Sequence, residues 1–440
     1  MVIYMRVLWL CNIMIPAIAK ELELPCSNRE GWLTGIYERI KKQNDKMDET
    51  LSVTEPLELG ICFPADVMPE GLEATHGKFS IGATACYCFK ENLTAPEIYE
   101  EGLEGVFDWI LKDFRPDMVH IFGTEFPHAL AMVRAYDKPD RILVGVQGLC
   151  FACAKAYMAD IPEAVRQRVT LRDYIRKDSI MQQQEKFYIR GEREIEVLKR
   201  VNHITGRTDF DREETKKING NAKYHFMNET MREPFYSGKW NRKECIPYTI
   251  FLSQGDYPLK GFHYVLQAMP EILTKYPKAS VLVAGNSVVE NKTWRDKIKI
   301  SSYGKYLRKL ISENGLEEQV KILGKCSAEE MKEQFLKCSV FVCPSSLENS
   351  PNSLGEAMLL GVPVVAAKVG GIPSLLVNEK EGLLYESANI KELAKAIMHV
   401  WEDPKETNRQ TEMARQEALQ RHNADSNFER LMEIYKEICI

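Results

Sequence analysis

Two carboxylates with seven residues between them, Glu348 and Glu356, are the side chains best placed to do chemistry. Glu348 lies in a polar loop, and Glu356 lies inside a helix predicted to begin at Asn352. The backbone amides of Asn352, Ser353 and Leu354 fall between the two acids at the positive end of that helix, which favours a phosphate. A helical rise of ~1.5 Å per residue separates the acids by on the order of 10 Å. Two hydroxyl-binding acids flanking a diphosphate fit a nucleotide sugar; the alternative is that one offsets the helix dipole and the other is solvated.

The elements that must position these acids follow from the pattern around them. The apolar run Val340–Cys343 predicts a buried strand. The helix predicted for Asn352–Leu360 ends at Gly361, a common C-terminal residue of helices, and Val362–Ala367 predicts the next buried strand. Strand, loop, helix and strand make half of a parallel α/β sheet, whose ligands bind at the carboxyl ends of the strands.

The stretch from Glu348, ENSPNSLGEAMLLGVPVVAAKVGG, resembles the donor-binding segment of retaining glycosyltransferases of family 4. It has the Glu-x7-Glu motif and the EAM-x2-G-x-PVVA continuation, in the bacterial polysaccharide-type variant where ENSPNS replaces EGFG. The resemblance implies an α/β protein of GT-B fold, in which two Rossmann-like domains with parallel sheets face an interdomain cleft. It also implies that Glu348 contacts hydroxyls of the donor sugar and that Glu356 contacts the ribose.

The same resemblance assigns roles near the start of the second domain. Family members have a strand, a Gly-Arg pair and then a Lys-Gly pair, and the Arg and Lys hold the donor diphosphate. Lys260-Gly261 matches the second pair, whereas Gln254 stands at the Arg position. Lys260 is therefore expected to stabilise the departing diphosphate, and Gln254 to supply a neutral hydrogen bond in place of a charge.

In the first domain the resemblance is weaker. Of the family's Gly-Gly pair in the first loop only Gly31 matches, because Glu30 takes the other place and its carboxylate would repel a phosphate. Plain turn chemistry is an equal explanation for Gly31. Arg207 follows a predicted strand and would face the interdomain cleft, where it is a candidate to meet an anion.

Family members tend to carry a histidine or a polar cluster after the strand predicted for Asp117–Gly123. His128, in the first turn of a helix, is the candidate for the cleft near the transferred sugar, and Glu125 is an alternative. His120 lies within the strand and is expected to be a buried, satisfied core histidine. A structural role remains the competing interpretation for all three residues.

Length and composition bound these interpretations. A chain of 440 residues is longer than a single hydrophobic core usually supports, so two domains are predicted. The predicted domains are residues 1–235 and 248–405, joined by a linker at 236–247. A C-terminal helix in 406–440 is predicted to cross back to the first domain. A net charge of −5 argues against a nucleic-acid binder, and no apolar run is long enough to span a membrane. The 12 scattered cysteines indicate reduced thiols and the cytosol rather than a secreted protein.

The resulting interpretation is a hexosyltransferase that moves a sugar from a nucleotide diphosphate sugar, with UDP favoured, to a glycan, lipid-linked or other hydroxyl acceptor. Such an enzyme would serve the synthesis of surface polysaccharides or glycoconjugates, with peripheral contact to the inner membrane face as a secondary interpretation. Catalytic roles go to Glu348, Lys260 and His128, and no metal or other cofactor is expected. The rivals are a weakly catalytic nucleotide-sugar-binding subunit, suggested by the missing Arg, and an epimerase or phosphorylase of the same architecture.

Overall fold

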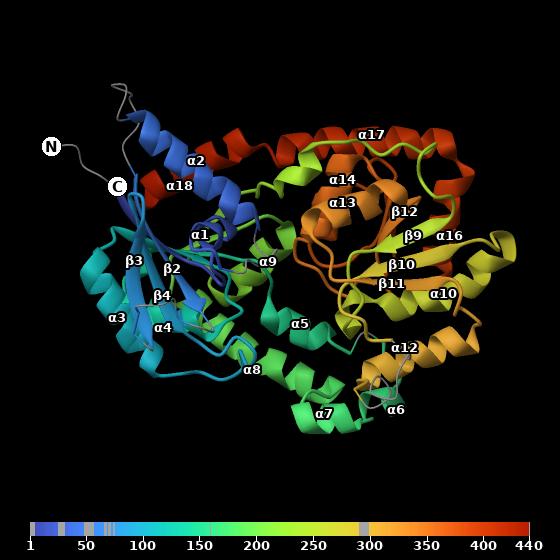
Figure 1. Ribbon diagram of the computed structural model, residues 1–440, viewed down its shortest axis with the longest axis horizontal. Helices are drawn as coiled ribbons and strands as arrows, with labels where there is room; N and C mark the ends of the chain where they lie inside the picture. The colour runs from blue at the N-terminus through green and yellow to red at the C-terminus, as the bar shows by residue number, and fades with distance from the viewer. Residues whose placement is uncertain are drawn as a thin grey trace. The chain divides into compact units, whose positions relative to one another are not determined.

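The computed structural model describes residues 5–24, 31–47, 57–65, 68, 72–73, 75–158, 160–289 and 299–439. The chain divides into two compact units (Figure 1). Unit 1 consists of Met1–Phe151, Phe187–Thr230 and His422–Ile440, and unit 2 consists of Ala152–Lys186 and Met231–Arg421. Each unit therefore contains segments that are far apart in the sequence.

This division differs from the predicted boundaries at two places. Residues 152–186, predicted within the first domain, belong to unit 2, because their side chains bond to that unit. Asp173 accepts a hydrogen bond from the Ser302 amide at 2.9 Å, and the Tyr264 hydroxyl donates to Asp160 at 2.9 Å. The chain rejoins unit 1 at His422 rather than near residue 406.

The predicted C-terminal helix is two helices in the structure, α17 (Pro404–Arg421) and α18 (Ala424–Cys439). The side chain of Asn423 accepts hydrogen bonds from the amides of Asp425 and Ser426, each at 3.0 Å. An asparagine that satisfies the first amides of a new helix starts that helix and ends the previous one.

Unit 1 is built on an eight-stranded sheet in the order β3-β4-β2-β1-β5-β6-β7-β8. Its pairs are parallel except β3 with β4, so the sheet is mixed rather than wholly parallel as predicted. The turn between these two strands contains Gly82, whose φ is 56°. The strands are β1 (Met5–Leu10), β2 (Leu57–Ala65), β3 (His76–Ile81), β4 (Thr84–Lys90), β5 (Met118–Phe122), β6 (Ile142–Gly145), β7 (His203–Gly206) and β8 (Lys223–Phe226).

The helices of unit 1 connect these strands and cover the sheet. They are α1 (Pro16–Glu21), α2 (Gly31–Met47), α3 (Gly102–Phe114), α4 (Pro127–Tyr136), α9 (Asp209–Ile218) and α18, with the short η1 (Pro139–Arg141) before β6. Helices α5 (Cys150–Ala156) and α8 (Ile180–Lys199) contribute residues to both units.

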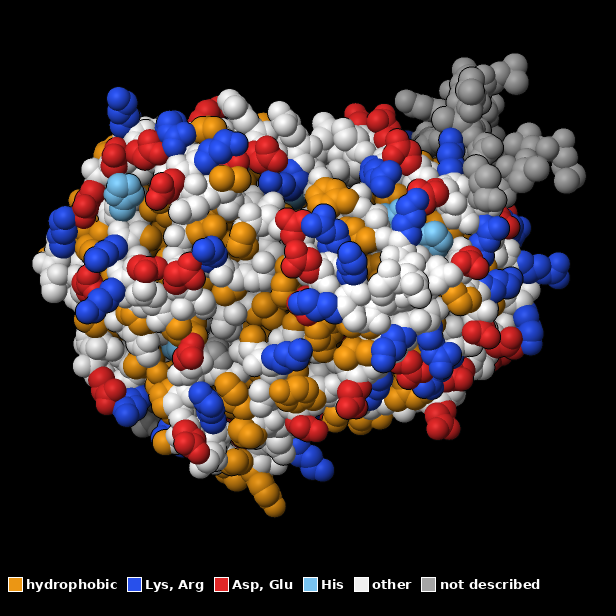
Figure 2. All heavy atoms as spheres, turned by 180° about the vertical axis from the view of Figure 1, so that it is seen from behind, with side chains coloured by type: hydrophobic (Ala, Val, Ile, Leu, Met, Phe, Trp, Pro, Cys, Tyr) orange, Lys and Arg blue, Asp and Glu red, His pale blue; other side chains and the backbone are white. Residues whose placement is uncertain are grey.

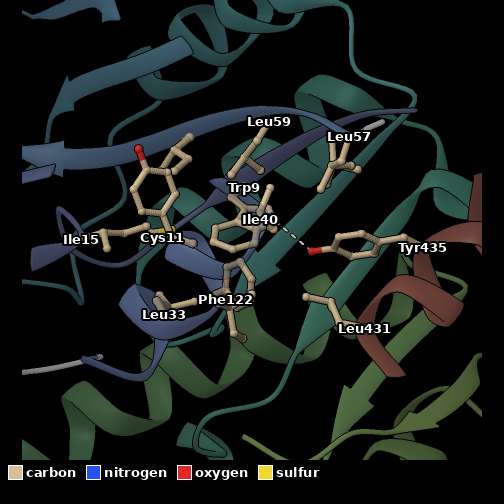
Figure 3. Packing of buried hydrophobic residues seen from close by; sticks show 14 of the residues in the cluster. Trp9, Cys11, Ile15, Leu33, Ile40, Leu57, Leu59, Phe122, Leu431 and Tyr435 are labelled. Atoms are coloured by element: carbon tan, nitrogen blue, oxygen red, sulfur yellow. Dashed lines mark hydrogen bonds between the residues drawn. The ribbon is translucent and has the colours of Figure 1, made fainter. Parts of the chain in front are cut away.

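The core of unit 1 joins its first strand to its last helix. Trp9 of β1 is fully buried, and its indole Nε1 donates a hydrogen bond to the Tyr435 hydroxyl of α18 at 2.8 Å (Figure 3). Leu431 of the same helix and Phe122 of β5 belong to this cluster of buried side chains. The last helix is thus part of the core of unit 1 and not an appendage.

Unit 2 is built on a six-stranded sheet in the order β11-β10-β9-β12-β13-β14, and each of its paired strands runs parallel. The strands are β9 (Thr249–Leu252), β10 (Ser280–Ala284), β11 (Val320–Gly324), β12 (Val340–Cys343), β13 (Val364–Ala367) and β14 (Leu383–Tyr385). Strands β9, β12 and β13 are buried along their whole length, because helices cover both faces of the sheet. This covering explains why the strands appear in the sequence as continuous apolar runs.

The helices of unit 2 pack as two groups. Helix α10 packs against α12 and α16, and α14 packs against α13 and α17. Their bounds are α6 (Glu163–Arg166), α7 (Leu171–Arg176), η2 (Glu233–Tyr236), η3 (Pro258–Lys260), α10 (Phe262–Lys275), α12 (Ser302–Glu313), α13 (Ala328–Lys337), α14 (Asn352–Leu360), α15 (Ile372–Leu375) and α16 (Ile390–Glu402). Among the helices that the structure describes, none combines the length and the apolar character of a membrane span.

Candidate nucleotide-sugar site

An ion pair lies at the carboxyl ends of β9 and β12, which are parallel neighbours in unit 2. Lys260, in η3 after β9, places its Nζ 2.6 Å from Oε1 of Glu348, which follows β12. The Ser345 hydroxyl donates to the same carboxylate oxygen at 2.7 Å. Burial lowers the pKa of the Lys260 ammonium, but Glu348 and Tyr257 together raise this pKa by more, so the net shift is upward. The pair therefore holds a permanent cation at the sheet edge.

Two glycines bring the backbone around this pair together. Gly261 has a φ of 67°, and a Cβ there would lie 2.0 Å from the Pro344 carbonyl oxygen. Gly370 has a φ of 49°, and a Cβ there would lie 2.0 Å from the carbonyl oxygen of Glu348. The Gly371 amide donates to that same carbonyl oxygen at 2.9 Å. Side chains at Gly261 or Gly370 would push the loop of Glu348 away from Lys260.

Helix α14 begins directly after the Glu348 loop, with Pro351 at its N-cap and no acidic residue in its first turn. Asn352 and Ser353 are partly exposed, whereas Leu354 is buried and its amide donates to the Pro351 carbonyl at 3.0 Å. The amide of Leu354 therefore has a partner within the chain already. The first turn still offers the positive end of a helix to an anion.

Glu356, one turn into α14, is only 2% exposed and is held by an arginine. Arg232 donates to both of its oxygens, from Nε at 2.7 Å and from an Nη at 2.9 Å. Burial raises the pKa of the Glu356 carboxyl, and Arg232 lowers it by less, so the net shift is upward. This bidentate pair has no signal in the sequence, because Arg232 lies 124 positions from Glu356, next to the predicted linker.

Gln254 follows β9 and is engaged by an acid. Its Nε2 donates to Oδ1 of Asp256 at 2.9 Å, and Asn286 donates to Oδ2 of the same carboxylate at 2.9 Å. A carboxylate therefore accompanies the position where the family has a phosphate-binding arginine. Sequence reasoning considered Gln254 alone and missed Asp256, although the two residues are only two positions apart.

In unit 1, His128 is fully buried and bonded through both ring nitrogens. Its Nδ1 lies 2.6 Å from a carboxylate oxygen of Glu91, and its Nε2 lies 2.9 Å from Oδ1 of Asn12. These residues follow strands β4 and β1, so the histidine does sit at the carboxyl ends of the strands. Asn12 also donates to Oε2 of Glu125 at 3.3 Å, which connects the two residues that the sequence offered as alternatives.

A second buried acid accompanies this network. Glu194 of α8 accepts hydrogen bonds from the Thr124 hydroxyl at 2.6 Å and from the Phe151 amide at 3.1 Å. Burial raises the pKa of Glu194 to about 7 and also raises the pKa of Glu125 above its ordinary value. Two carboxyls with raised pKa values thus lie near the end of β5, and nothing in the sequence distinguishes Glu194 within its long helix.

The remaining candidates of unit 1 have structural partners. His120 is buried, with Nδ1 2.7 Å from the Tyr435 hydroxyl, and burial lowers its pKa to about 3. Arg207 is buried and lies 2.6 Å from a carboxylate oxygen of Glu229, so its charge is compensated inside unit 1. Gly31 is the first residue of α2, and Glu30 lies outside the described residues.

One group of side chains in the described part of the chain has the geometry to hold a metal ion. His203, His225 and Glu437 place one ligand atom each within 4.8 Å of the others. His203 is the first residue of β7, so this group does not lie at the carboxyl ends of the strands. Glu437 already pairs with Lys223, a cation that opposes a metal at this position.

Comparison with known proteins finds similarity within unit 2. Residues 234–417 match the family described as glycosyl transferases group 1. An uncharacterized glycosyltransferase of Methanocaldococcus jannaschii is 25% identical over 177 residues, which are 40% of this chain and 42% of that protein. The D-inositol 3-phosphate glycosyltransferase of Corynebacterium urealyticum is 28% identical over 185 residues, 41% of each protein. The matched region thus spans less than half of the length of these curated relatives.

Solved structures resemble the whole chain. Sucrose-phosphate synthase from Thermosynechococcus elongatus superposes with a TM-score of 0.65 at 14% identity and covers 99% of both chains. Anabaena HepE in complex with UDP-glucose superposes with a TM-score of 0.63 at 16% identity, covering 99% of this chain and 100% of that one. At such identities the likeness shows the fold, and it confirms the predicted GT-B class of two α/β units.

Proposed function

We propose that this chain is a retaining hexosyltransferase of family 4 that transfers a sugar from a nucleotide diphosphate sugar, with UDP as the nucleotide. The observation that carries the proposal is the Lys260–Glu348 pair, joined at 2.6 Å beside the acid-free first turn of α14. Both features lie inside the segment that matches glycosyl transferases group 1. A sheet edge with a fixed cation, a helix terminus and a hydroxyl-binding carboxylate suits a diphosphate linked to a sugar.

In the proposed reaction the bond between the anomeric carbon and the diphosphate oxygen breaks, and the leaving diphosphate gains negative charge. Lys260 and the amides at the start of α14 oppose that charge where it grows. Glu348 binds sugar hydroxyls rather than attacking the anomeric carbon, because a double displacement requires a second carboxyl about 5 Å from the nucleophile. The acceptor hydroxyl attacks from the same face, and its proton passes to the leaving phosphate oxygen. This scheme uses no metal ion.

We assign acceptor binding to unit 1. We also propose that the transfer serves the synthesis of surface polysaccharides or glycoconjugates. The His128–Glu91 pair and Asn12 would shape that side of the reaction from the strand ends. The acceptor is a glycan or a lipid-linked hydroxyl, and we propose that the enzyme works in the cytosol, where its free thiols stay reduced.

A second candidate function is favoured by the contact between Gln254 and Asp256. A carboxylate beside the position of the missing arginine lowers the positive potential available to a diphosphate. A chain of this kind would bind a nucleotide sugar without transferring the sugar. Turnover of the donor separates this candidate from the transferase.

The test is a screen of UDP-, GDP- and ADP-sugars against the purified full chain, with the melting temperature and then sugar transfer as readouts. At a hundred times Kd a bound donor stabilises the fold by about 2.7 kcal/mol. The wild type should be stabilised by a UDP-sugar and Lys260→Met should not, whereas Lys275→Met, which removes a surface ion pair with Glu402, should behave as the wild type. Failure of every nucleotide sugar to stabilise the wild type contradicts both candidates.

The anomeric configuration of the product distinguishes the finer claim. Retention, measured by NMR on the first product formed, is the expected outcome. Inversion would remove the family 4 assignment while leaving the glycosyltransferase activity in place. Stabilisation by a UDP-sugar with no transfer to any sugar or lipid acceptor would favour the binding protein.

A further inference from the structure

Helix α7 (Leu171–Arg176) has its polarity inverted. Its aspartate, Asp173, is fully buried, whereas its apolar residues Leu171, Tyr174 and Ile175 are 58%, 76% and 69% exposed. A helix on the surface of a soluble domain normally buries its apolar side chains and exposes its acids. This arrangement leaves large apolar side chains in contact with water, which costs free energy relative to burying them, so other interactions must hold the helix in this orientation.

Buried hydrogen bonds fix α7 in this orientation. Thr170 and Asp173 form a capping box at the start of the helix. The carboxylate of Asp173 also accepts hydrogen bonds from the amide and the hydroxyl of Ser302 in α12, at 2.9 and 2.5 Å. The Ser302 hydroxyl also lies 2.5 Å from the Arg168 carbonyl oxygen. The apolar side chains therefore point outward from a helix that is held in place, not from a loop that happens to be extended.

Exposed apolar residues are concentrated around this helix. Of the thirteen large hydrophobic side chains that are exposed in the described residues, five lie between residues 169 and 181, namely Val169, Leu171, Tyr174, Ile175 and Met181. Figure 2 shows hydrophobic side chains projecting at the lower edge of the molecule, where Figure 1 places α7. Concentrated apolar exposure of this kind marks a surface that binds something, whereas single exposed residues do not.

The charges around these residues are positive. Arg168, Arg176 and Lys177 are exposed and take part in no ion pair within the described part of the chain. The two nearest acids in the sequence, Asp173 and Asp178, both pair with Arg172. Glu163 of α6 and Glu185 of α8 are exposed and lie at a greater distance in the sequence. Apolar side chains flanked by uncompensated cations match the surface of an anionic lipid bilayer, which offers acyl chains and negative headgroups.

We propose that this surface, the α7 patch, docks the protein onto anionic lipid, with the five apolar residues entering the interface and the three cations meeting the headgroups. A second copy of the chain fits less well, because a symmetric contact would set the three cations of one copy against those of the other. The proposal does not depend on the transferase assignment. If the protein docks in this way, a lipid-linked acceptor and the enzyme would lie on the same membrane surface, which supports the lipid-linked class of acceptor.

The experiment is cosedimentation of the full chain with vesicles of phosphatidylcholine, with and without phosphatidylglycerol, at low and at high salt. Binding should require phosphatidylglycerol and weaken with salt. Each cation near such a surface contributes about 1 kcal/mol, about fivefold in affinity, so Arg176→Gln with Lys177→Gln should weaken binding roughly 25-fold. Tyr174→Ser with Ile175→Ser should weaken it at least as much, because two interfacial side chains are removed.

The matched control replaces two other exposed apolar residues of unit 2, as Ile246→Ser with Val377→Ser. This variant should bind vesicles as the wild type does. The melting temperature of all variants should stay within a few degrees of the wild type, since the replaced side chains face water. Three results overturn the proposal: no binding of the wild type to anionic vesicles, equal loss in the control variant, or a dimer in solution that only the Tyr174→Ser, Ile175→Ser variant dissociates.

Discussion

Replacing Arg232 by Met should destabilise unit 2 in a pH-dependent manner, because Arg232 is the bidentate partner of a carboxylate that is almost fully buried. Methionine keeps an apolar stem that can still lie on the ring of Phe235, which the guanidinium now covers at 4.8 Å. The substitution therefore removes the charge and the two hydrogen bonds while keeping much of the packing. What remains is a carboxyl group at Glu356 that is 2% exposed.

The size of the effect follows from this burial. Breaking a buried ion pair costs about 3–5 kcal/mol, and because the side chain of Arg232 is 21% exposed, solvent screening reduces the expected loss to about 2–3 kcal/mol at pH 8. For a unit of this size that loss lowers the melting temperature by about 5–10 °C. The loss is a large fraction of the stability of an ordinary domain.

The pH dependence gives the prediction its direction. Burial already raises the pKa of Glu356 in the folded state, and removal of Arg232 raises this pKa further. A group with a raised folded pKa contributes stability that is present below its unfolded pKa and is lost as the pH rises through the folded pKa. The penalty of Arg232→Met should therefore be small at pH 5 and grow towards pH 8, with a slope of at most about 1.36 kcal/mol per pH unit.

Urea unfolding of the wild type, Arg232→Met, Glu356→Gln and the double variant at pH 5 and pH 8 measures these free energies. Adding Glu356→Gln to Arg232→Met should recover stability at pH 8, because the buried charge is then gone. A penalty of equal size at both pH values, or a double variant that is less stable than Arg232→Met at pH 8, would refute the account of a buried, charge-dependent pair.

Three further predictions concern single contacts. Glu348→Gln should leave the Lys260 ammonium uncompensated, so UDP should bind more tightly while sugar transfer slows; weaker binding of UDP in calorimetry would contradict this. Gln254→Arg alone should change the affinity for UDP less than about threefold, because Asp256 will pair with the new cation. Gln254→Arg combined with Asp256→Asn should tighten UDP binding roughly tenfold. A tenfold gain from Gln254→Arg alone would contradict pairing between the new arginine and Asp256. Glu194→Gln should make the protein more stable than the wild type by about 2–3 kcal/mol at pH 8 but not at pH 5. The reason is that the wild type loses stability as the pH rises through the Glu194 pKa of about 7. Equal free energies of unfolding for the two proteins at pH 8 would show that burial of this carboxylate costs nothing.

The fold of unit 2 was predictable because its strands are short apolar runs between strong turn residues. The runs that became β12 and β13 were predicted within a few residues of their observed bounds, and Gly361 ends α14 as predicted, with a φ of 70°. The motif spacing also placed Lys260 and Glu348 in one site. Their direct contact was not readable, because 88 residues separate them and only the parallel register of β9 and β12 brings the strand ends together.

The helical region from residue 155 to 200 shows what the sequence alone could not determine. Its basic and acidic residues alternate along the whole region in a pattern typical of one solvated helical stretch, but the structure breaks it into α5, α6, α7 and α8. Lys177 ends α7 in the left-handed conformation, with a φ of 50°, which helix propensity does not reveal. The burial of Asp173 depends on Ser302 in a distant helix, so neither the break nor the inverted polarity of α7 has a local signal.

The cations that the sequence singled out are all paired with carboxylates in the structure. Lys260 is paired with Glu348, and Arg207 is paired with Glu229. A diphosphate that approaches Lys260 therefore meets an ion pair rather than a bare charge, and its attraction to the site is weaker than a count of basic residues implies. An ammonium has three N–H donors, so Lys260 can keep Glu348 and still donate to a phosphate oxygen. In the site that we propose, Lys260 would therefore set the distance between the Glu348 carboxylate, which binds the sugar hydroxyls in that proposal, and the donor diphosphate.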